Sequence, residues 1–279
     1  MPTFAGPDRI AVGDVRVTFL ADGGGVTDPH VAWPDSTPEA WNHHRRHLDE
    51  NGKFVTSVGG FLVETGDRKV VVDTGIGDMR VDFPGVGYFE GGRFLDSLAT
   101  TGVAPEEVTD VVYTHLHLDH CGWTTTEGSL TFPNARHLVA AGEWDHWHGG
   151  DDPAGPDPVR VQQALEGNLD HVSDGETIAP GVDVVFTPGH TPGHLSLVVS
   201  SGVSRLLILG DAMHCAVQMS EPQWNIAFDM DPDMARATRA RLLQELERPD
   251  TLGAACHFAS GLTFGRVLVG EGTRYWGIN

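Results

Sequence analysis

Cysteine and positive charge are both scarce in this chain of 279 residues. Its three cysteines cannot all pair within one chain, which excludes a disulfide framework and favours a reducing compartment. Lys and Arg total 18 against 39 Asp and Glu, a formal net charge of −21. Phosphate backbones and anionic membrane surfaces would repel such a chain, so neither a nucleic-acid nor a membrane partner is expected.

Long apolar runs are also lacking. No stretch approaches the length of about 18 apolar residues that spans a bilayer. The first ten residues, MPTFAGPDRI, have neither the basic start nor the apolar run of a signal peptide. These features predict a cytoplasmic protein.

Hydrophobic periodicity predicts strands mixed with helices along the chain. A strand is expected at residues 15–20, ended by Asp22 and the three glycines that follow it. Thr37 and Pro38 mark the start of a short helix that runs through EAWNHHRRHLDE. Further strands are predicted at 60–64, 69–72, 110–113, 182–186, 195–200 and 205–209, and helices at 94–100 and 105–107.

A longer helix is predicted near the end of the chain. Asp231 and Pro232 have the residue types of an N-cap and a first helical residue, and the pattern continues to about residue 247. Its buried stripe is expected to contain Met234, Ala237, Leu242 and Leu246. Strands that alternate with helices in this way are typical of a layered α/β protein.

Histidine is abundant, with 15 residues, and four potential metal ligands follow the predicted strand at 110–113. His115 and His117 project to the same side if the chain stays extended, because side chains alternate along a strand. Asp119 and His120 lie just beyond and can turn toward the same point. Burying three imidazoles and a carboxylate is costly unless a partner such as a divalent cation satisfies them.

Single potential ligands end three later runs of apolar or small residues. His190 follows VVFTPG, Asp211 follows LLILG, and His257 follows LGAAC. Functional loops gather at strand ends, so these residues are candidates for the same site. Taken singly each is weak, since an isolated histidine is more often a satisfied core residue.

The joint pattern closely resembles the metallo-β-lactamase superfamily. HLHLDH at 115–120 matches the HxHxDH signature, and TPGHTPGHLS at 187–196, LGDAMH at 209–214 and ACHF at 255–258 match the later motifs in order. VVDTG at 71–75 resembles an early strand-and-turn motif, and the likeness spans roughly residues 15–267. It implies a four-layer αβ/βα sandwich with two mixed sheets, formed as one domain by residues 1–279. An N-terminal insertion at about 26–52 would cover the active site.

The resemblance also implies which side chains hold two metal ions. His115, His117 and His190 would bind the first ion, Asp119, His120 and His257 the second, and Asp211 would bridge both. A hydroxide between the metals would then attack the substrate. Asp73 resembles a group that orients a ligand histidine, although capping of its turn is an equal alternative. Ligands of this kind favour two zinc ions, with manganese, cobalt or iron as alternatives.

Two branches of the superfamily resemble the chain best. The acyl-homoserine lactone lactonases carry a Tyr three residues after the bridging Asp, where this chain has His214. The methyl parathion hydrolase-like group is the better match, from Gly210 through AACHF. We assign catalytic roles to Asp119 and to His214, which would contact the substrate carbonyl or the leaving alkoxide. The alternative for His214 is a pocket-wall residue satisfied by the backbone.

The sequence thus predicts a dinuclear zinc hydrolase of a small, largely apolar ester or lactone. Phosphotriester hydrolysis is the alternative within the fold, and iron-dependent persulfide oxidation is the alternative from another class. Trp33 and Trp224 are expected to line the substrate pocket, and Cys121, Cys215 and Cys256 to be buried thiols near the site. The partner is a small molecule, and a homodimer remains open.

Overall fold

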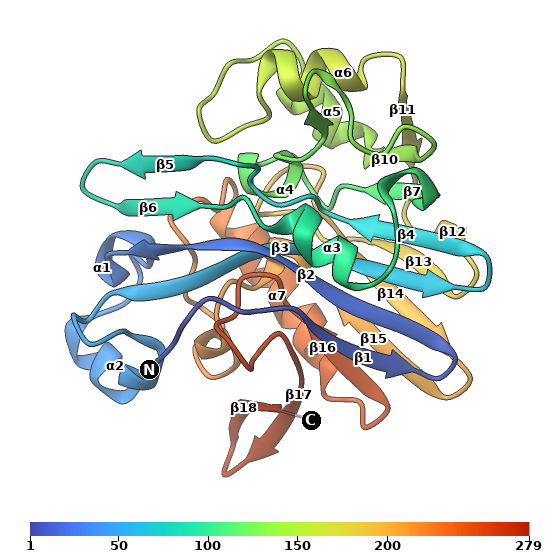
Figure 1. Ribbon diagram of the computed structural model, residues 1–279. Coiled ribbons are helices and arrows are strands. Elements are labelled where there is room, and N and C mark those ends of the chain that lie inside the picture. Colours follow the sequence, from blue (N-terminus) through green and yellow to red (C-terminus); the bar gives the residue numbers. More distant parts are fainter. Residues whose placement is uncertain (279) are drawn as a thin grey trace.

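Two mixed β-sheets lie face to face, and helices cover their outer surfaces (Figure 1). This computed structural model describes residues 1–278. Apolar side chains from the inner faces of both sheets, among them Val17, Phe61, Val184 and Leu197, form a buried cluster between the sheets. The order helix, sheet, sheet, helix confirms the four-layer α/β fold predicted from the sequence.

Within the described residues, the first sheet has nine strands. In spatial order these are β11 (Leu169–Val172), β10 (Arg136–Ala140), β7 (Asp110–Val112), β4 (Arg68–Val72), β3 (Phe54–Thr65), β2 (Val15–Thr27), β6 (Gly87–Glu90) and β5 (Arg80–Phe83), with β1 (Asp8–Val12) paired to β2. β7 runs parallel to both β4 and β10, whereas the long pair β2 and β3 is antiparallel.

The second sheet has seven strands in the same part of the chain. They follow sequence order: β12 (Thr177–Ala179), β13 (Val182–Phe186), β14 (Leu195–Ser201), β15 (Ser204–Ile208), β16 (Thr251–Ala254), β17 (Phe264–Gly270) and β18 (Thr273–Ile278). Only the pair β15 and β16 is parallel among these strands. A separate small hairpin is formed by β8 (Thr125–Thr126) and β9 (Ser129–Leu130).

Helices pack on the outer face of each sheet. Those on the side of the first sheet are α3 (Phe94–Thr100), α4 (Leu118–Cys121), α5 (Ala141–Trp147), the π-helical η3 (Pro158–Gln162) and α6 (Gln163–Leu165). The second sheet is covered by α7 (Pro232–Leu246). The remaining helices are α1 (Pro29–Ala32), α2 (Pro38–His43), and the short 3₁₀ turns η1 (Arg45–His47), η2 (Pro105–Glu107), η4 (Gly210–Ala212) and η5 (Ala216–Met219). Every helix within residues 1–278 falls short of the length and apolar character that crossing a bilayer requires.

Three local predictions are wrong in detail. β2 continues through Asp22 and the glycines to Thr27, so these residues do not end the strand. The helix that starts at Pro38 ends at His43, and η1 follows it as a separate turn. In α7, Met234 and Ala237 are exposed, and the buried stripe consists of Ala235, Thr238, Arg239, Leu242, Leu243 and Leu246. Its N-cap prediction is confirmed, because the Asp231 side chain accepts from the Met234 N–H.

Candidate metal centre

The predicted ligand residues lie in loops and short helical turns that follow four strands, β7, β13, β15 and β16. His115 and His117 follow β7, and Asp119 and His120 lie in α4. His190 follows β13, Asp211 lies in η4 directly after β15, and His257 follows β16. The structure therefore brings together all seven side chains from positions up to 142 residues apart, since 257 − 115 = 142. Asp119 keeps 17% of its side chain exposed, while the other six residues are buried.

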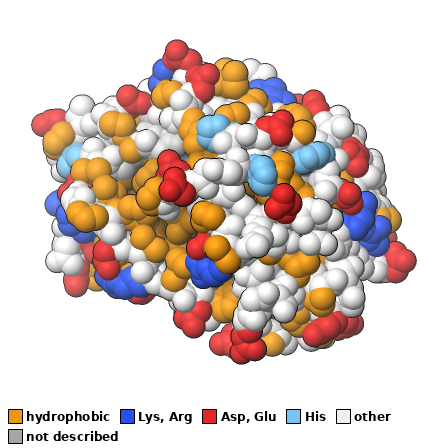
Figure 2. Space-filling model, turned by 90° about the horizontal axis from the view of Figure 1, so that it is seen from above, with side chains coloured by type: hydrophobic (Ala, Val, Ile, Leu, Met, Phe, Trp, Pro, Cys, Tyr) orange, Lys and Arg blue, Asp and Glu red, His pale blue; other side chains and the backbone are white. Residues whose placement is uncertain are grey.

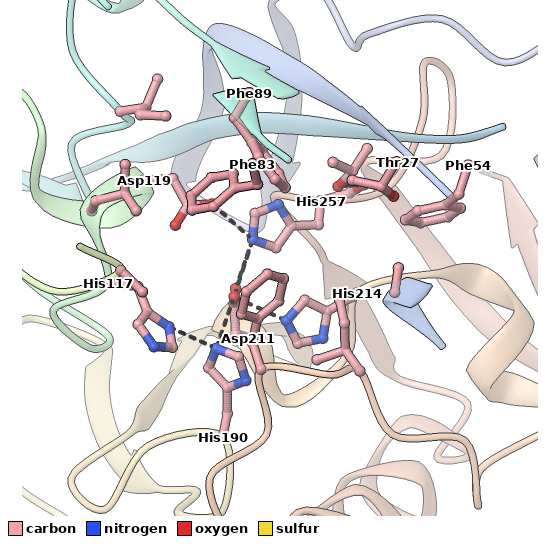
Figure 3. A pocket seen from close by; sticks show the side chains of 17 residues that line it. Thr27, Phe54, Phe83, Phe89, His117, Asp119, His190, Asp211, His214 and His257 are labelled. Atoms are coloured by element: carbon pink, nitrogen blue, oxygen red, sulfur yellow. Dashed lines mark hydrogen bonds and ion pairs between the residues drawn. The ribbon is translucent and has the colours of Figure 1, made fainter. Parts of the chain in front are cut away.

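Three imidazoles form the first half of the cluster. Nδ1 of His117 lies 3.0 Å from Nε2 of His115. The same atom lies 2.9 Å from Nε2 of His190 (Figure 3). Nδ1 of His117 faces two other imidazole nitrogens at once, and its single lone pair or proton can serve only one of them in a hydrogen bond. A divalent cation between them is the partner that suits three imidazole nitrogens best.

Asp211 occupies the middle of the cluster, and Figure 3 shows it between His257, His190 and His214. Oδ1 lies 3.2 Å from Nε2 of His120 and 3.0 Å from Nε2 of His257. Oδ2 lies 3.3 Å from Nε2 of His190 and 3.7 Å from Nε2 of His115, and it is also 3.1 Å from Nε2 of His257, so this oxygen lies between the two halves. A carboxylate in this position can contribute one oxygen to each of two neighbouring cations.

The second half of the cluster contains Asp119, His120 and His257. Asp119 is the most peripheral member, with its oxygens 3.9 Å from Nε2 of His120 and 3.7 Å from Nε2 of His257. Cys256 lies on the same side, with its sulfur 3.7 Å from Oδ1 of Asp211. Burial raises the pKa of the Cys256 thiol well above its usual value, so the thiol is protonated here; with His120, Asp211 and His257 it forms a group whose ligand atoms are close enough to hold one ion. All three cysteines are buried and unpaired, as predicted.

Fixed acceptors orient the other ring nitrogen of several of these histidines. Nδ1 of His120 lies 2.9 Å from Oδ2 of Asp73, and Nδ1 of His257 lies 2.8 Å from the backbone oxygen of Ser57. Because an ionised carboxylate or a carbonyl can only accept, each Nδ1 carries the proton and Nε2 is directed at the centre. This arrangement is the one that metal-binding histidines commonly show, and it favours the orienting role for Asp73.

His190 has an orienting partner that the sequence did not reveal. Its Nδ1 lies 2.9 Å from Oδ1 of Asp229, which is itself buried. Nη2 of Arg239, a fully buried residue of α7, lies 3.5 Å from the other Asp229 oxygen. Asp229 sits in FDMDPD, where three acids stand close together, and no spacing rule separates the buried one from its exposed neighbours.

The pKa shifts of the clustered residues follow their distance from the carboxylates; burial lowers the pKa of His190, but Asp211 and Asp229 outweigh it and raise the value to about 9. Burial lowers the pKa values of His115 and His117 well below the usual value, and neighbouring histidines add to the effect. Burial also acts on His120, but Asp211, Asp73 and Asp119 outweigh it and hold the pKa of His120 well above the usual value. Burial raises the pKa of Asp211, yet the surrounding histidines reverse this and lower its pKa well below the usual range. Asp211 is therefore ionised, as a bridging ligand must be.

A pocket opens above the cluster and is walled by apolar side chains (Figure 3). Phe83 and Phe89 from the β5–β6 hairpin meet edge to face, with ring centroids 5.9 Å apart. The rest of the apolar wall consists of Ala32, Phe54, Ile76, Leu118, Ala154, Ile226 and Phe228. Figure 2 shows hydrophobic side chains gathered around a hollow on one face, with acidic side chains scattered across it.

The expectation that Trp33 and Trp224 line this pocket is wrong. Both are buried in an aromatic cluster behind the pocket wall, where their neighbours Ala32 and Ile226 form the surface. Trp33 meets Phe54 edge to face at 5.6 Å, and Trp224 packs on Trp41 at 5.2 Å. The two tryptophans hold residues 26–52 against the loop after η5, so they shape the pocket from behind.

His214 lines the pocket beside Asp211. Its Nε2 lies 3.0 Å from Oδ2 of Asp211, and its backbone N–H donates to Oε1 of Gln218 at 2.7 Å. Burial lowers the pKa of His214 to about 4, so the ring is neutral at pH 7. Since the carboxylate can only accept, the single proton resides on Nε2 and points at the centre of the cluster.

The chain combines a four-layer sandwich with a cluster of histidines and aspartates at one edge. This combination is characteristic of a class of metal-dependent enzymes. The chain belongs to the metallo-β-lactamase superfamily, whose family model matches residues 58–257. This confirms the family predicted from the motifs.

Several characterised proteins are similar to the chain. An N-acyl homoserine lactonase from Bacillus sp is 26% identical over 204 residues, which cover 68% of this chain and 77% of that protein. The hydrolase AbOPH of the β-lactamase superfamily has a structure with a TM-score of 0.82 at 26% identity, covering 99% of this chain and 98% of that one. AidC, a dizinc quorum-quenching lactonase solved with a product, has a TM-score of 0.84 at 22% identity over 99% and 98% of the two chains, which establishes a shared fold.

Proposed function

We propose that this chain is a dinuclear zinc hydrolase that opens a lactone ring, with simple esters as further substrates. The observation that carries the proposal is the placement of the Asp211 carboxylate between two sets of imidazoles, each directed at it. The N-acyl homoserine lactonases that align with two thirds of the chain support lactones as the substrate class.

We propose His115, His117 and His190 as ligands of the first zinc and Asp119, His120 and His257 as ligands of the second. Asp211 would bridge the two ions, while Asp73 and Asp229 orient His120 and His190. When bound, the two ions would supply Lewis acidity and lower the pKa of a coordinated water toward neutrality.

The side chains around the centre have separate tasks in this proposal. Asp119, the most exposed of the acids, is placed to accept the proton that the attacking water gives up and to pass it to the alkoxide that leaves as the ring opens. His214 holds a proton at Nε2, which Asp211 accepts in this structure, and we propose that the proton turns to the substrate oxygen on which charge develops. The phenylalanines of the pocket exclude water and bind the apolar part of the substrate.

The pocket walls favour an uncharged substrate with an apolar substituent. Phe54, Phe83, Phe89 and Phe228 provide aromatic surface, whereas Lys and Arg are missing from the residues that line this pocket. A polyanionic substrate would also meet the negative charge of the whole chain, −21. A neutral lactone or ester avoids both costs.

Elemental analysis followed by a substrate screen tests the proposal. We expect about two zinc ions per chain, and the highest kcat/KM among a lactone, an aryl ester, a thioester and a phosphotriester for the lactone. A preference for the phosphotriester would assign the chain to organophosphate hydrolysis. One iron per chain with oxygen consumption on a persulfide donor would replace the hydrolytic proposal.

We also propose a cytoplasmic location, which the three unpaired buried thiols support. Fractionation of the source cells tests the location. Light scattering of the purified protein measures whether two copies associate as a homodimer.

A further inference from the structure

Glu143 is a buried carboxylate of α5 that none of the sequence motifs contains. Its Oε1 accepts the backbone N–H of Leu116 at 3.0 Å and the indole N–H of Trp147 at 2.7 Å. Its Oε2 accepts the hydroxyl of Thr191 at 2.6 Å and the backbone N–H of Gly193 at 3.0 Å. All four partners are neutral donors, and together they satisfy both oxygens of the carboxylate.

Three of these four donors belong to the two loops that carry the first metal position. Leu116 lies between His115 and His117, and Thr191 directly follows His190. A single side chain therefore fastens both loops to α5. Trp147, the fourth donor, also packs edge to face on His117 with ring centroids 5.4 Å apart. Through these contacts Glu143 supports both loops that carry the ligands of the first metal position, and also Trp147, which packs on one of those ligands.

Close packing makes this connection rigid. A Cβ atom added at Gly193 would lie 2.2 Å from the backbone nitrogen of Glu143, so only glycine allows the second loop to approach α5 this closely. His117 and His190, which the two loops position, are separated by only 2.9 Å between Nδ1 and Nε2. A small shift of either loop changes that distance directly.

We propose that Glu143 is a positioning residue that sets the spacing between His117 and His190 and thereby the zinc affinity of the first metal position. This inference rests on the proposed dinuclear zinc centre. A carboxylate is required because it offers acceptor sites to all four donors. An amide in its place would turn an NH₂ group toward two of them and push one loop away.

Zinc affinity, measured by competition with a chromogenic chelator, tests the inference without using activity. In Glu143→Gln we expect one zinc to bind as in the unchanged protein and the other to bind at least about 10-fold more weakly, the usual effect of losing such a supporting contact. Asp145→Asn is the matched control, because Asp145 lies on the same helix but is exposed. It should bind both ions as the unchanged protein does.

Two backgrounds assign the effect to one position. With His257→Ala, which weakens the second position, Glu143→Gln should lower the affinity for the remaining zinc by the same factor. With His190→Ala, which weakens the first position, Glu143→Gln should have little effect on the remaining zinc. The reverse pattern, or equal affinities in Glu143→Gln and the unchanged protein, would overturn the inference.

A milder variant covers the case in which Glu143→Gln does not fold. Thr191→Val removes one donor to Glu143 and keeps the side-chain volume, so it should weaken the same zinc by several-fold. Unchanged binding in a folded Thr191→Val protein would then count against Glu143. If the unchanged protein binds no zinc, the proposed function fails instead, and the two failures are distinguishable.

Discussion

Oδ2 of Asp73 lies 2.9 Å from Nδ1 of His120, and the same carboxylate also accepts the backbone N–H and the hydroxyl of Thr114 at 2.7 and 2.8 Å. Asp73 adopts a φ of 59°, one of three non-glycine residues with positive φ among those described. This left-handed conformation costs of order 1 kcal/mol for a residue with a side chain, so the contacts of Asp73 must hold it there. The backbone after β4 is thus shaped to aim a carboxylate at His120.

We predict that Asp73→Ala weakens binding of the second zinc by about 10- to 100-fold, because His120 loses the acceptor that orients its ring. Asp73→Asn should retain most of the affinity, since Asn tolerates positive φ and keeps one oxygen. Chelator competition measures both values. If Asp73→Ala binds two zinc ions as tightly as the unchanged protein, Asp73 only caps its turn.

His214 provides the next prediction. Replacing it by Phe should lower kcat on a lactone by at least about 100-fold while two zinc ions remain bound, because the proton on Nε2 is lost from the centre. Phe suits the site sterically, since His214 already packs edge to face with Trp33. The zinc content of the same sample separates a lost contact from a lost ion. A His214→Phe protein with two zinc ions and full turnover would leave His214 as part of the pocket wall.

The seven clustered residues could be predicted because each ends an apolar strand or lies in one short motif. The carboxylates that support them could not. Three of the four hydrogen bonds to Glu143 come from residues 27, 48 and 50 positions away, and Asp229 pairs with His190 across 39 positions. Nothing local to either acid distinguishes it from the many exposed acids among the 39 in the chain. These two acids can be buried because hydrogen-bond donors from distant parts of the chain satisfy their oxygens.

The prediction that the glycines end the strand at β2 is wrong for a related reason. A run of three glycines after Asp22 is typical of a turn, but here a Cβ at Gly23 would lie 1.9 Å from the backbone oxygen of Glu90. Gly25 would meet the ring of Phe89 at 2.6 Å. The glycines permit close approach of the β5–β6 hairpin. This contact depends on the pairing of β6 with β2, which the sequence alone does not reveal. Likewise, Arg239 is buried in α7 because Asp229 and backbone oxygens surround it.

His47 predicts a specific dependence of stability on pH. Burial, together with nearby Arg46 and His44, lowers its pKa to about 4, and its Nε2 accepts from Nε of Arg46 at 3.1 Å. In the unfolded chain the pKa is about 6.5. Above pH 6.5 the residue is neutral in both states, so its contribution is constant. As the pH falls from 6.5 to 4, only the unfolded chain gains the proton, and stability falls by up to about 3 kcal/mol.

Urea unfolding of the unchanged protein and of His47→Gln between pH 7 and pH 4.5 measures this contribution. Gln keeps an acceptor for Arg46 but does not titrate, so the variant should lose less stability as the pH falls. The difference between the two proteins cancels the effects of histidines elsewhere. Parallel stability curves for the two proteins would show that His47 takes up its proton equally in both states.

Asp22 provides the last prediction, which concerns stability alone. Oδ1 of this buried residue accepts the N–H groups of Gly92, Arg93 and Phe94 at 2.8 to 3.0 Å, and the indole N–H of Trp123 at 3.1 Å. Oδ2 accepts the N–H groups of the loop at 76–77. Since α3 begins at Phe94 and has no side-chain cap of its own, a residue of β2 satisfies its first N–H groups.

We expect Asp22→Asn to lower the free energy of unfolding by about 3 kcal/mol, because an NH₂ group would face several of these donors. The loss should appear in urea unfolding with zinc present at saturating concentration, so that ligand occupancy is equal in all samples. Asp67→Asn, in the exposed turn between β3 and β4, is the matched control and should change stability by less than about 0.5 kcal/mol. Equal stability of the two variants would mean that the donors around Asp22 find other acceptors, and that the carboxylate does not anchor α3 to β2.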